Sequence, residues 1–291
     1  MAATKLVVVV GETASGKSDL AFKLAQKFNG EIICADSWTV RKYADIGTAK
    51  PSAEEQATIP HHLLDIVEPC EDFTAAVFKR LASQAVKDIS NRGKLPILTG
   101  GTGLYVDGVI YDFGFLPAGD RRAREELNML TNQELLNKIK KMNIKLRNVD
   151  IRNKRRLIRL IETEGAVPAK AGLRPNTLII GLQTDRDRLQ ERIIERTDAM
   201  LAAGLEREVA GLAERYSWDC EALKGVGYAQ WKGYFDGRQT LPETRQKIIK
   251  ATLDLAKRQR TWFKRNKSIH WFLTPVKWPE VVDTLTTFLD H

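Results

Sequence analysis

The sequence has few cysteines and no long apolar run. Its three cysteines, Cys34, Cys70 and Cys220, are odd in number and far apart, so we expect reduced thiols and neither a disulfide framework nor a zinc site. No apolar run approaches the roughly 18 residues that a membrane span needs. The N-terminal residues lead directly into a strand-like run, Leu6–Val10, without the pattern of a signal peptide. These absences predict a cytoplasmic protein that does not enter a membrane.

The chain is also short of negative charge. It has 46 lysines and arginines against 37 aspartates and glutamates, a formal net charge of +9. The excess is concentrated, because residues 138–159 carry ten basic residues and one acid, and residues 244–267 carry nine and one. Charged runs are usually solvated helix faces. Two such runs, the second with the aromatic pair Trp262-Phe263, nevertheless favour a polyanionic partner such as a nucleic-acid backbone.

A phosphate-binding motif lies near the N-terminus. Residues 11–18 read Gly-Glu-Thr-Ala-Ser-Gly-Lys-Ser and match Gly-x-x-x-x-Gly-Lys-Ser. The motif follows an apolar run and precedes a helical segment, an order that predicts a loop whose backbone N–H groups bind phosphate. We expect Lys17 to reach the terminal phosphates and the Ser18 hydroxyl to help hold Mg²⁺. The ligand-binding residues predicted here are Gly11, Thr13, Ala14, Ser15, Gly16, Lys17 and Ser18. The loop alone leaves open whether the anion is ATP, GTP or another diphosphate.

Strand-like apolar segments alternate with helical ones along most of the chain. The expected strands are Leu6–Val10, Glu31–Ala35, Leu95–Thr99, Thr177–Leu182 and Ile269–Phe272. This alternation is typical of a parallel sheet flanked by helices. With the phosphate loop it predicts an α/β fold like that of the P-loop NTPases and nucleotide kinases. Between residues 118 and 174 the sequence is helical throughout. We therefore expect a P-loop core of residues 1–117 and 175–291 and a helical insertion domain of residues 118–174.

Two other predicted strands end in segments that suit ligand binding. Ala35-Asp36-Ser37 places a carboxylate and a hydroxyl at the carboxyl edge of the sheet, where ligands bind in open α/β folds. Asp36 could bind a metal or accept a proton, although Asp-Ser after a strand often only caps a turn. A second glycine turn, Gly100-Gly101-Thr102, permits close backbone approach to a ligand and offers a hydroxyl for a hydrogen bond. A tight turn selected for geometry alone is the alternative.

Two more segments have patterned side chains. In residues 244–267 one helix face is expected to pack and the other to be cationic; the packing residues are Ile248, Thr252, Leu255, Gln259 and Trp262. His61 and His62 are adjacent in an extended segment, so their side chains point to opposite faces and cannot easily bind one metal ion. We expect structural or substrate-positioning roles for both histidines.

Taken together, the motifs resemble those of the tRNA dimethylallyltransferases, also called tRNA isopentenyltransferases. The resemblance rests on Gly11–Ser18, Ala35-Asp36-Ser37, Asp45–Pro51, His61–Asp65, Gly100–Tyr105, Gly204-Leu205 with Glu208-Val209, Gly227-Tyr228, and Lys257-Arg258-Gln259 with Thr261-Trp262. It implies transfer of a dimethylallyl group from dimethylallyl diphosphate to N6 of the adenosine just 3′ of the anticodon, in tRNAs that read codons beginning with U. It also implies that the phosphate loop holds the diphosphate of the donor, with Mg²⁺.

The resemblance assigns roles to individual residues as well. It implies that Asp36 accepts the proton from adenine N6, that Thr102 binds the diphosphate or its bridging oxygen, and that Arg258 places a cation on the leaving group. The residues expected to contact the substrates are Ser37, Asp45, Lys50, Gly100, Gly101, Lys257, Gln259 and Trp262. The target base must leave its stack. The insertion is expected to clamp the anticodon stem of the tRNA, and the protein is expected to be a monomer.

The chain departs from this family pattern at three places. It reads Trp38-Thr39-Val40-Arg41 where members usually carry Gln and then a hydrophobic-Tyr pair. Leu253 stands where members have a phosphate-binding arginine, and Glu12 stands where proline is frequent. Arg41 or Arg260 could substitute for the missing arginine.

Three other functions fit part of the pattern. Prenyl transfer to free AMP, ADP or ATP, as in the adenylate isopentenyltransferases, is close but needs no basic insertion. A nucleotide or small-molecule kinase shares the order of strand, loop and helix, yet requires neither Asp45–Pro51 nor Gly100–Tyr105. An RNA-binding protein that keeps an inactive loop is the last alternative.

Overall fold

The computed structural model describes residues 4–117, 119–146 and 149–291. The chain forms two compact units, one of Met1–Ile110 with Leu173–His291 and one of Tyr111–Gly172. The second unit begins before the expected insertion because Gly114 pairs with Ala169 in an antiparallel bridge. Ala118, the first residue of the expected insertion, and Arg147 of the basic run lie outside the described residues.

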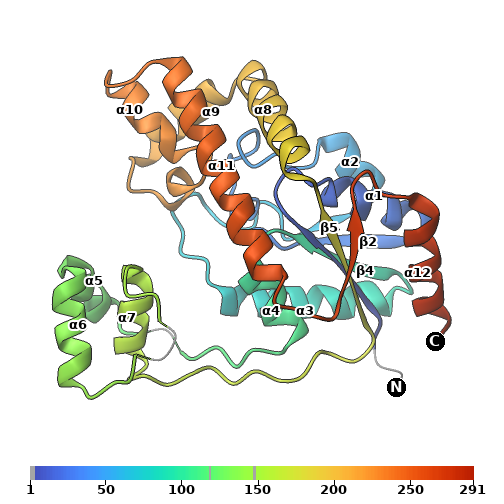
Figure 1. Ribbon diagram of the computed structural model, residues 1–291, viewed down its shortest axis with the longest axis horizontal. Coiled ribbons are helices and arrows are strands. Elements are labelled where there is room, and N and C mark those ends of the chain that lie inside the picture. The colour runs from blue at the N-terminus through green and yellow to red at the C-terminus, as the bar shows by residue number, and fades with distance from the viewer. Residues whose placement is uncertain (1–3, 118, 147–148) are drawn as a thin grey trace. The chain divides into compact units, whose positions relative to one another are not determined.

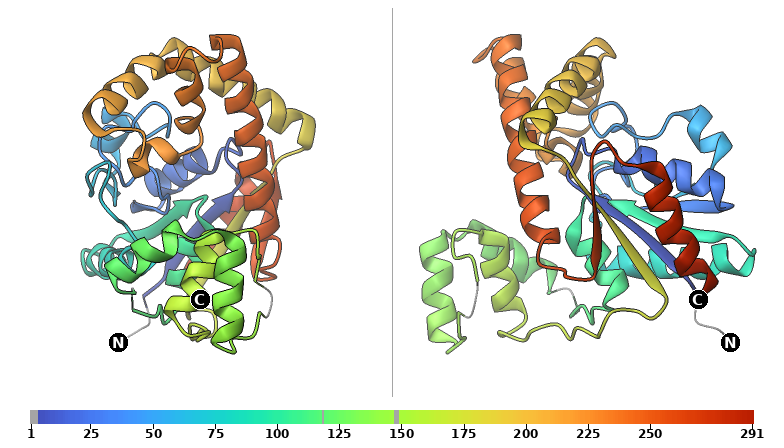
Figure 2. Two further views of the ribbon diagram at one scale, coloured as in Figure 1. Left: turned by 90° about the vertical axis from the view of Figure 1, so that its left-hand side faces the viewer. Right: turned by 45° about the vertical axis from the view of Figure 1, so that its right-hand side comes forward.

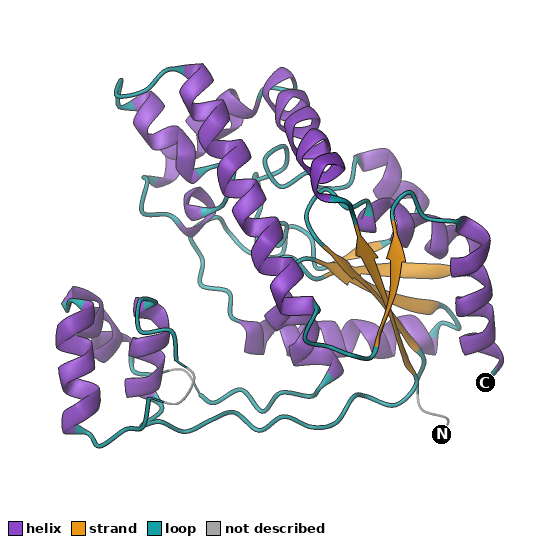
Figure 3. Ribbon diagram, in the orientation of Figure 1, coloured by secondary structure: helices purple, strands orange, loops and turns teal. Residues whose placement is uncertain are grey.

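Within the described residues, the first unit is built on a six-stranded sheet in which all paired strands are parallel (Figures 1 and 3). The strand order is β3-β2-β4-β1-β5-β6. The strands are β1 (Leu6–Gly11), β2 (Gly30–Cys34), β3 (His61–His62), β4 (Leu95–Gly100), β5 (Thr177–Gln183) and β6 (Ile269–Leu273). All five expected strands are present, each within one residue at either end. The predicted α/β fold with a parallel sheet is confirmed.

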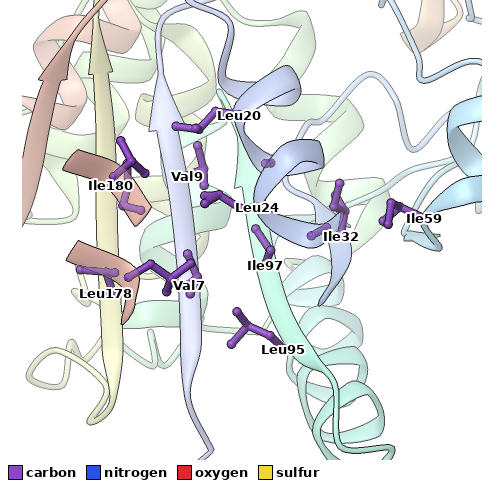
Figure 4. Packing of buried hydrophobic residues seen from close by; sticks show 14 of the residues in the cluster. Val7, Val9, Leu20, Leu24, Ile32, Ile59, Leu95, Ile97, Leu178 and Ile180 are labelled. Atoms are coloured by element: carbon purple, nitrogen blue, oxygen red, sulfur yellow. The ribbon is translucent and has the colours of Figure 1, made fainter. Parts of the chain in front are cut away.

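Strand β1 lies between β4 and β5. Val8 pairs with Leu98 on one side and with Ile179 on the other. Every residue of β1 is buried, which explains why the strand is a continuous apolar run and not an alternating one. Figure 4 shows part of the core, where Val7 and Val9 of β1 pack with side chains of α1 (Lys17–Lys27).

Helices flank the sheet on both sides, and in Figures 1 and 2 the strands lie between α11 (Leu241–Phe263) and α12 (Trp278–Asp290). Val281 and Leu285 of α12 join α1 in the same core cluster. The other helices of this unit are α2 (Ala53–Thr58), α3 (Ala75–Asn91), α4 (Gly103–Ile110), α8 (Arg186–Ala202), α9 (Leu205–Tyr216) and α10 (Lys232–Phe235), with the short turns η1 (Glu221–Lys224) and η2 (Ala229–Trp231). Among the described residues, no helix is both long enough and apolar enough to cross a membrane.

Helix α11 begins at a capping box, in which Thr240 and Glu243 exchange hydrogen bonds between side chain and backbone. Pro242 lies in the first turn of α11, where its missing N–H removes no intrahelical hydrogen bond. Ile248 and Gln259 are buried, whereas Lys257 and Arg258 are exposed. One packed face and one cationic face are therefore confirmed for this segment.

In its described residues the second unit contains α5 (Arg121–Met129), α6 (Asn132–Lys141) and α7 (Lys154–Glu162). The helices enclose a core of their own, formed by Leu127, Leu135, Ile139, Leu157, Ile158 and Ile161. The Glu162 side chain is only 3% exposed and pairs with Arg124 and Arg159 at 3.2 and 3.1 Å. In the described part of the basic run, the solvent-exposed cations are Lys138, Lys140, Lys141, Lys145, Arg152, Arg155 and Arg156. The apolar stripes of these helices thus face inward and leave the positive charge on the surface.

The prediction of three reduced thiols is wrong for two of them. Cys70 and Cys220 form a disulfide, although they are 150 residues apart. The fold brings their loops together, since the Ala222 N–H donates to Pro69 O at 3.0 Å. Only Cys34 is a free thiol, and burial raises its pKa to about 12. An odd count of scattered cysteines does not reveal such a long-range pair.

Candidate active site

Residues 11–18 join β1 to α1: Gly11 ends the strand, residues 12–16 form the loop, and Lys17 and Ser18 begin the helix. Gly16 caps α1 with a φ of 88°, and Ala14 has a φ of 61°; this left-handed region favours glycine. A Cβ on Gly11 would lie 3.0 Å from Leu182 O. Glycine is therefore needed at both ends of the turn. In this geometry the backbone N–H groups of a loop and a helix N-terminus can bind one phosphate group.

The second and third predicted segments meet at the carboxyl edge of the sheet. The Ser37 N–H donates to Thr102 Oγ1 at 3.1 Å, and the Thr102 N–H donates to Ala35 O at 3.2 Å. A Cβ on Gly100 would lie only 2.1 Å from Ala35 O, so no other residue permits this approach. The two strand ends are in direct contact.

The Asp36 carboxylate lies at the same edge and lines a cavity. One of its oxygens accepts the Trp38 N–H at 2.8 Å. Asp36 thus makes the turn-capping contact that was the alternative to a chemical role. The turn-capping contact does not exclude a chemical role, because the hydrogen bond from the Trp38 N–H holds the Asp36 carboxylate at the cavity.

The cavity is bordered by the phosphate loop, the strand ends, α8 and α11, and about 150 Å³ of it is open to water-sized molecules. The predicted site residues that line it are Thr13, Lys17, Ser18, Asp36, Gly100 and Gln259. Its apolar lining includes Ile32, Leu64, Ile193, Met200, Ile248 and Leu255. A lining that contains both cations and apolar side chains suits a ligand that combines phosphates with a hydrocarbon.

Lys17 and Arg196 of α8 supply positive charge to this cavity. Burial, together with the charge of Arg196, lowers the pKa of Lys17 to about 8, against an opposing effect of Asp36. Burial also lowers the pKa of Arg196. Because these two neighbouring cations repel one another, a bound anion stabilises both of them.

Sequence reasoning missed Arg196 and its neighbour Arg192. Arg192 Nη1 donates to Ser15 O at 3.3 Å, and Arg196 Nη2 donates to Thr48 O at 3.4 Å. With Arg188 they recur every fourth residue along one face of α8. This spacing was a usable signal, although the same spacing is common on solvated helices.

Gln259 of α11 connects the two glycine turns. Its Oε1 accepts the Thr13 N–H at 2.7 Å, and its Nε2 donates to Gly101 O at 3.1 Å. The predicted substrate-binding residue Gln259 therefore holds both turns in register at the wall of the cavity. The contacts of Gly101 and Thr102 place these residues at the border of the same site.

The segment Asp45–Pro51 forms another wall of the cavity. The buried Lys50 ammonium donates to Arg41 O at 2.6 Å and pairs with the carboxylates of Asp45 and Asp65. Glu208 of α9 accepts the backbone N–H groups of residues 45–47 at 2.7 to 3.0 Å. Lys50 and Asp45 thus stabilise the segment, and its members that line the cavity are Gly47, Thr48, Ala49 and Pro51.

Among the described residues that line the cavity, Lys257, Arg258 and Trp262 are absent. Lys257 and Arg258 are exposed on α11. Trp262 Nε1 donates to Asp107 Oδ2 at 3.1 Å. The role of Arg258 as the cation on the leaving group stays a prediction.

The two suggested replacements for the missing arginine both have protein partners. Arg41 is buried, and its Nη1 donates to Pro69 O at 2.9 Å and to Glu71 O at 2.8 Å. Arg260 binds the carboxylate of Glu12. Arg196 is the arginine that lines the cavity beside Lys17.

His61 and His62 make separate contacts. His62 Nε2 lies 2.7 Å from Glu31 Oε2, and His61 Nδ1 lies 2.7 Å from Ile59 O. In the described part of the chain, no group of three His, Cys, Asp or Glu side chains is arranged to hold a metal ion. The Ser18 hydroxyl and the Asp36 carboxylate are oxygen donors at the cavity, the type that Mg²⁺ takes when substrate phosphates supply other ligands.

Sequence comparison relates the chain to one family. The sequence model described as IPP transferase matches residues 39–266. A tRNA dimethylallyltransferase of Anoxybacillus flavithermus is 42% identical over 280 residues, which cover 92% of this chain and 90% of that protein. A tRNA dimethylallyltransferase of Bacillus subtilis is 38% identical over 289 residues, with coverage of 93% and 91%.

Solved structures agree with the sequence comparison. The tRNA isopentenylpyrophosphate transferase of Bacillus halodurans superimposes with a TM-score of 0.76 at 38% identity, covering 99% of this chain and 96% of that chain. A eukaryotic dimethylallyltransferase acting on tRNA gives a TM-score of 0.77 at 26% identity, with coverage of 93% and 74%. The fold, including its P-loop, is shared with these enzymes. Because the family match spans most of the chain and the relatives align along nearly all of it, this protein belongs to the IPP transferase family.

Proposed function

We propose that this protein transfers a dimethylallyl group from dimethylallyl diphosphate to N6 of the adenosine just 3′ of the anticodon, in tRNAs that read codons beginning with U. One observation carries the proposal: Asp36, Lys17 and Arg196 line a single cavity that also has an apolar wall. The names of the relatives, tRNA dimethylallyltransferase and tRNA isopentenylpyrophosphate transferase, support it.

The diphosphate of the donor fits the charged end of the cavity. The loop N–H groups, the N-terminus of α1, Lys17 and Arg196 neutralise the negative charge that grows on the diphosphate as its bond to the allylic carbon breaks. Further positive charge comes from Mg²⁺ when it is bound through the Ser18 hydroxyl. The apolar wall receives the dimethylallyl group and keeps water away from the reacting carbon.

Asp36 is positioned to act as the base. The N6 atom of adenine attacks the allylic carbon, so a C–N bond forms while the C–O bond breaks and its electron pair leaves with the diphosphate. The proton released from N6 passes to the Asp36 carboxylate. The Trp38 N–H holds this carboxylate at 2.8 Å and fixes its orientation beside the cavity.

The acceptor proposed here is a tRNA and not a free nucleotide. The helical unit of residues 111–172 has its own core and several exposed lysines and arginines. Such a cationic surface suits the sugar-phosphate backbone of an RNA, whereas binding of a mononucleotide does not need a basic surface of this extent. The target adenine must be unstacked to reach a base in a cavity. We propose in addition that the enzyme acts as a monomer in the cytoplasm.

A transfer assay tests the proposal. The protein is incubated with labelled dimethylallyl diphosphate and Mg²⁺, and unmodified tRNA or AMP is supplied in parallel. The expected result is N6-dimethylallyl adenosine in digested tRNA and little label in AMP. Prenylation of AMP alone would indicate an adenylate isopentenyltransferase. ATP consumption without prenyl transfer would indicate a kinase.

A further inference from the structure

Glu12 places a carboxylate in the loop that binds the diphosphate in the proposed function. The residue is 3% exposed, and its backbone oxygen accepts the Lys17 ammonium at 3.2 Å. The negative charge of Glu12 also acts on Lys17: it opposes the lowering of the Lys17 pKa that burial and Arg196 cause. A buried anion this close to an anion-binding loop repels a diphosphate unless a cation balances it.

Arg260 of α11 is the cation that meets this carboxylate. Its Nε and Nη2 atoms donate to the two Glu12 oxygens at 2.8 and 2.9 Å, and Nη2 also donates to Thr184 O at 3.2 Å. Both carboxylate oxygens are thus occupied in a bidentate pair, the geometry in which a guanidinium is held most firmly. The adjacent residue Gln259 binds the Thr13 N–H. Consecutive residues of α11 therefore hold consecutive residues of the loop.

We propose that Arg260 is a positioning residue that acts through Glu12: it neutralises the carboxylate in the loop and does not bind the diphosphate itself. This assignment differs from the alternative in which Arg260 replaces the family's missing phosphate-binding arginine. The inference depends on the proposed function in one respect, namely that the loop binds a diphosphate. Because the pair is neutral as a whole, the carboxylate in the loop does not weaken the site that Lys17 and Arg196 provide.

The test measures the dissociation constant of inorganic diphosphate with Mg²⁺ by calorimetry, on the full-length protein. Charge balance predicts that R260Q weakens binding roughly tenfold or more, because it leaves one uncompensated carboxylate near the anion. The double variant E12Q/R260Q should bind within about threefold of the unmodified protein, because both charges are then gone. R260K should keep most of the affinity, since it preserves the positive charge. If Arg260 bound the diphosphate directly, the double variant would stay as weak as R260Q.

A matched control lies on the same helix. Arg245 makes a bidentate pair with Asp198 at 2.6 and 2.8 Å, and neither residue is among the described residues that line the cavity. R245Q should therefore leave diphosphate affinity unchanged, and thermal unfolding of each variant verifies that it is folded. A double variant without rescue, or an R260Q variant with unchanged affinity, would overturn the inference while the proposed function stands. Failure of the unmodified protein to bind diphosphate would overturn the proposed function, and the inference with it.

Discussion

Single residues determine the chemistry, and Asp36 is the first of them. Asn has nearly the same shape as Asp and can still accept the Trp38 N–H, but it cannot take up the proton from N6. D36N should therefore slow prenyl transfer by about 10²- to 10⁴-fold. Single-turnover kinetics with saturating tRNA and donor measure the rate. A D36N enzyme with the full rate would remove Asp36 as the base.

Lys17 makes donor binding depend on pH. Its pKa is lowered to about 8 in the free protein, and a bound diphosphate raises it again because opposite charge favours the ammonium form. A group whose pKa is higher in the complex than in the free protein makes its full contribution to affinity at pH values below the pKa of the free protein. This contribution is lost as the pH rises above that value. We therefore expect the contribution of Lys17 to diphosphate affinity to be steady below about pH 7 and to fall above pH 8.

K17A is the control for this pH dependence. The variant binds more weakly at neutral pH, and any pH dependence that it retains comes from the diphosphate and from other groups. The difference between the two titrations isolates Lys17. Parallel curves for the two proteins would show that Lys17 does not titrate in the site.

Arg196 and Arg258 are the two candidates for the arginine that binds the leaving diphosphate. Arg196 is half-buried and lines the cavity, whereas Arg258 is exposed on α11. We therefore expect R196Q to lower kcat/KM for the donor about tenfold or more, because it removes a charged contact from the cavity. R258Q should change kcat/KM for the donor only slightly. Steady-state kinetics with varied donor and constant tRNA measure both. The reverse order would restore the role that the sequence assigned to Arg258.

At the scale of elements, the exposed cations of α6 and α7 are expected to bind the RNA backbone. Replacing Lys140, Lys141 and Arg156 with Gln should weaken tRNA binding and flatten its dependence on salt. The slope of log affinity against log salt should fall by about 0.7 to 0.9 for each phosphate that the protein no longer neutralises. AMP turnover, if measurable, should not change.

A control for this triple variant is K87Q, which removes an exposed lysine from α3. It should leave both affinity and slope unchanged, and filter binding at several salt concentrations measures each protein. An unchanged slope in the triple variant would exclude these three side chains from the RNA-binding surface.

Elements with a local pattern could be predicted from the sequence. The valine run of β1, the glycine spacing of the loop and the apolar spacing along α11 each depend on neighbours in the chain. Strand β3 has only two residues, so it carries no periodicity. Arg192 and Arg196 were missed because their four-residue spacing is also common on solvated helices, and their role depends on how α8 lies at the phosphate loop.

At the scale of the whole molecule, the interactions that sequence reasoning missed are long-range. The Glu12–Arg260 pair joins residues 248 positions apart, and the Cys70–Cys220 disulfide joins residues 150 apart. In each pair, the residues that flank one partner in the sequence give no indication of which distant residue it contacts. The bounds of the helical unit show the same limit, because residues 111–117 have no helical or strand pattern and are joined to it by pairing near Ala169.

The most direct test of the account uses the complete reaction. Unmodified tRNA is incubated with the protein, dimethylallyl diphosphate and Mg²⁺, digested with a nuclease, and mapped by mass spectrometry. We predict one added dimethylallyl group per tRNA, on the adenosine just 3′ of the anticodon, and a small fraction of that product in the same incubation time when D36N replaces the unmodified enzyme. Fragments without this added mass after incubation with the unmodified enzyme, or with the group on another nucleotide, would contradict the account.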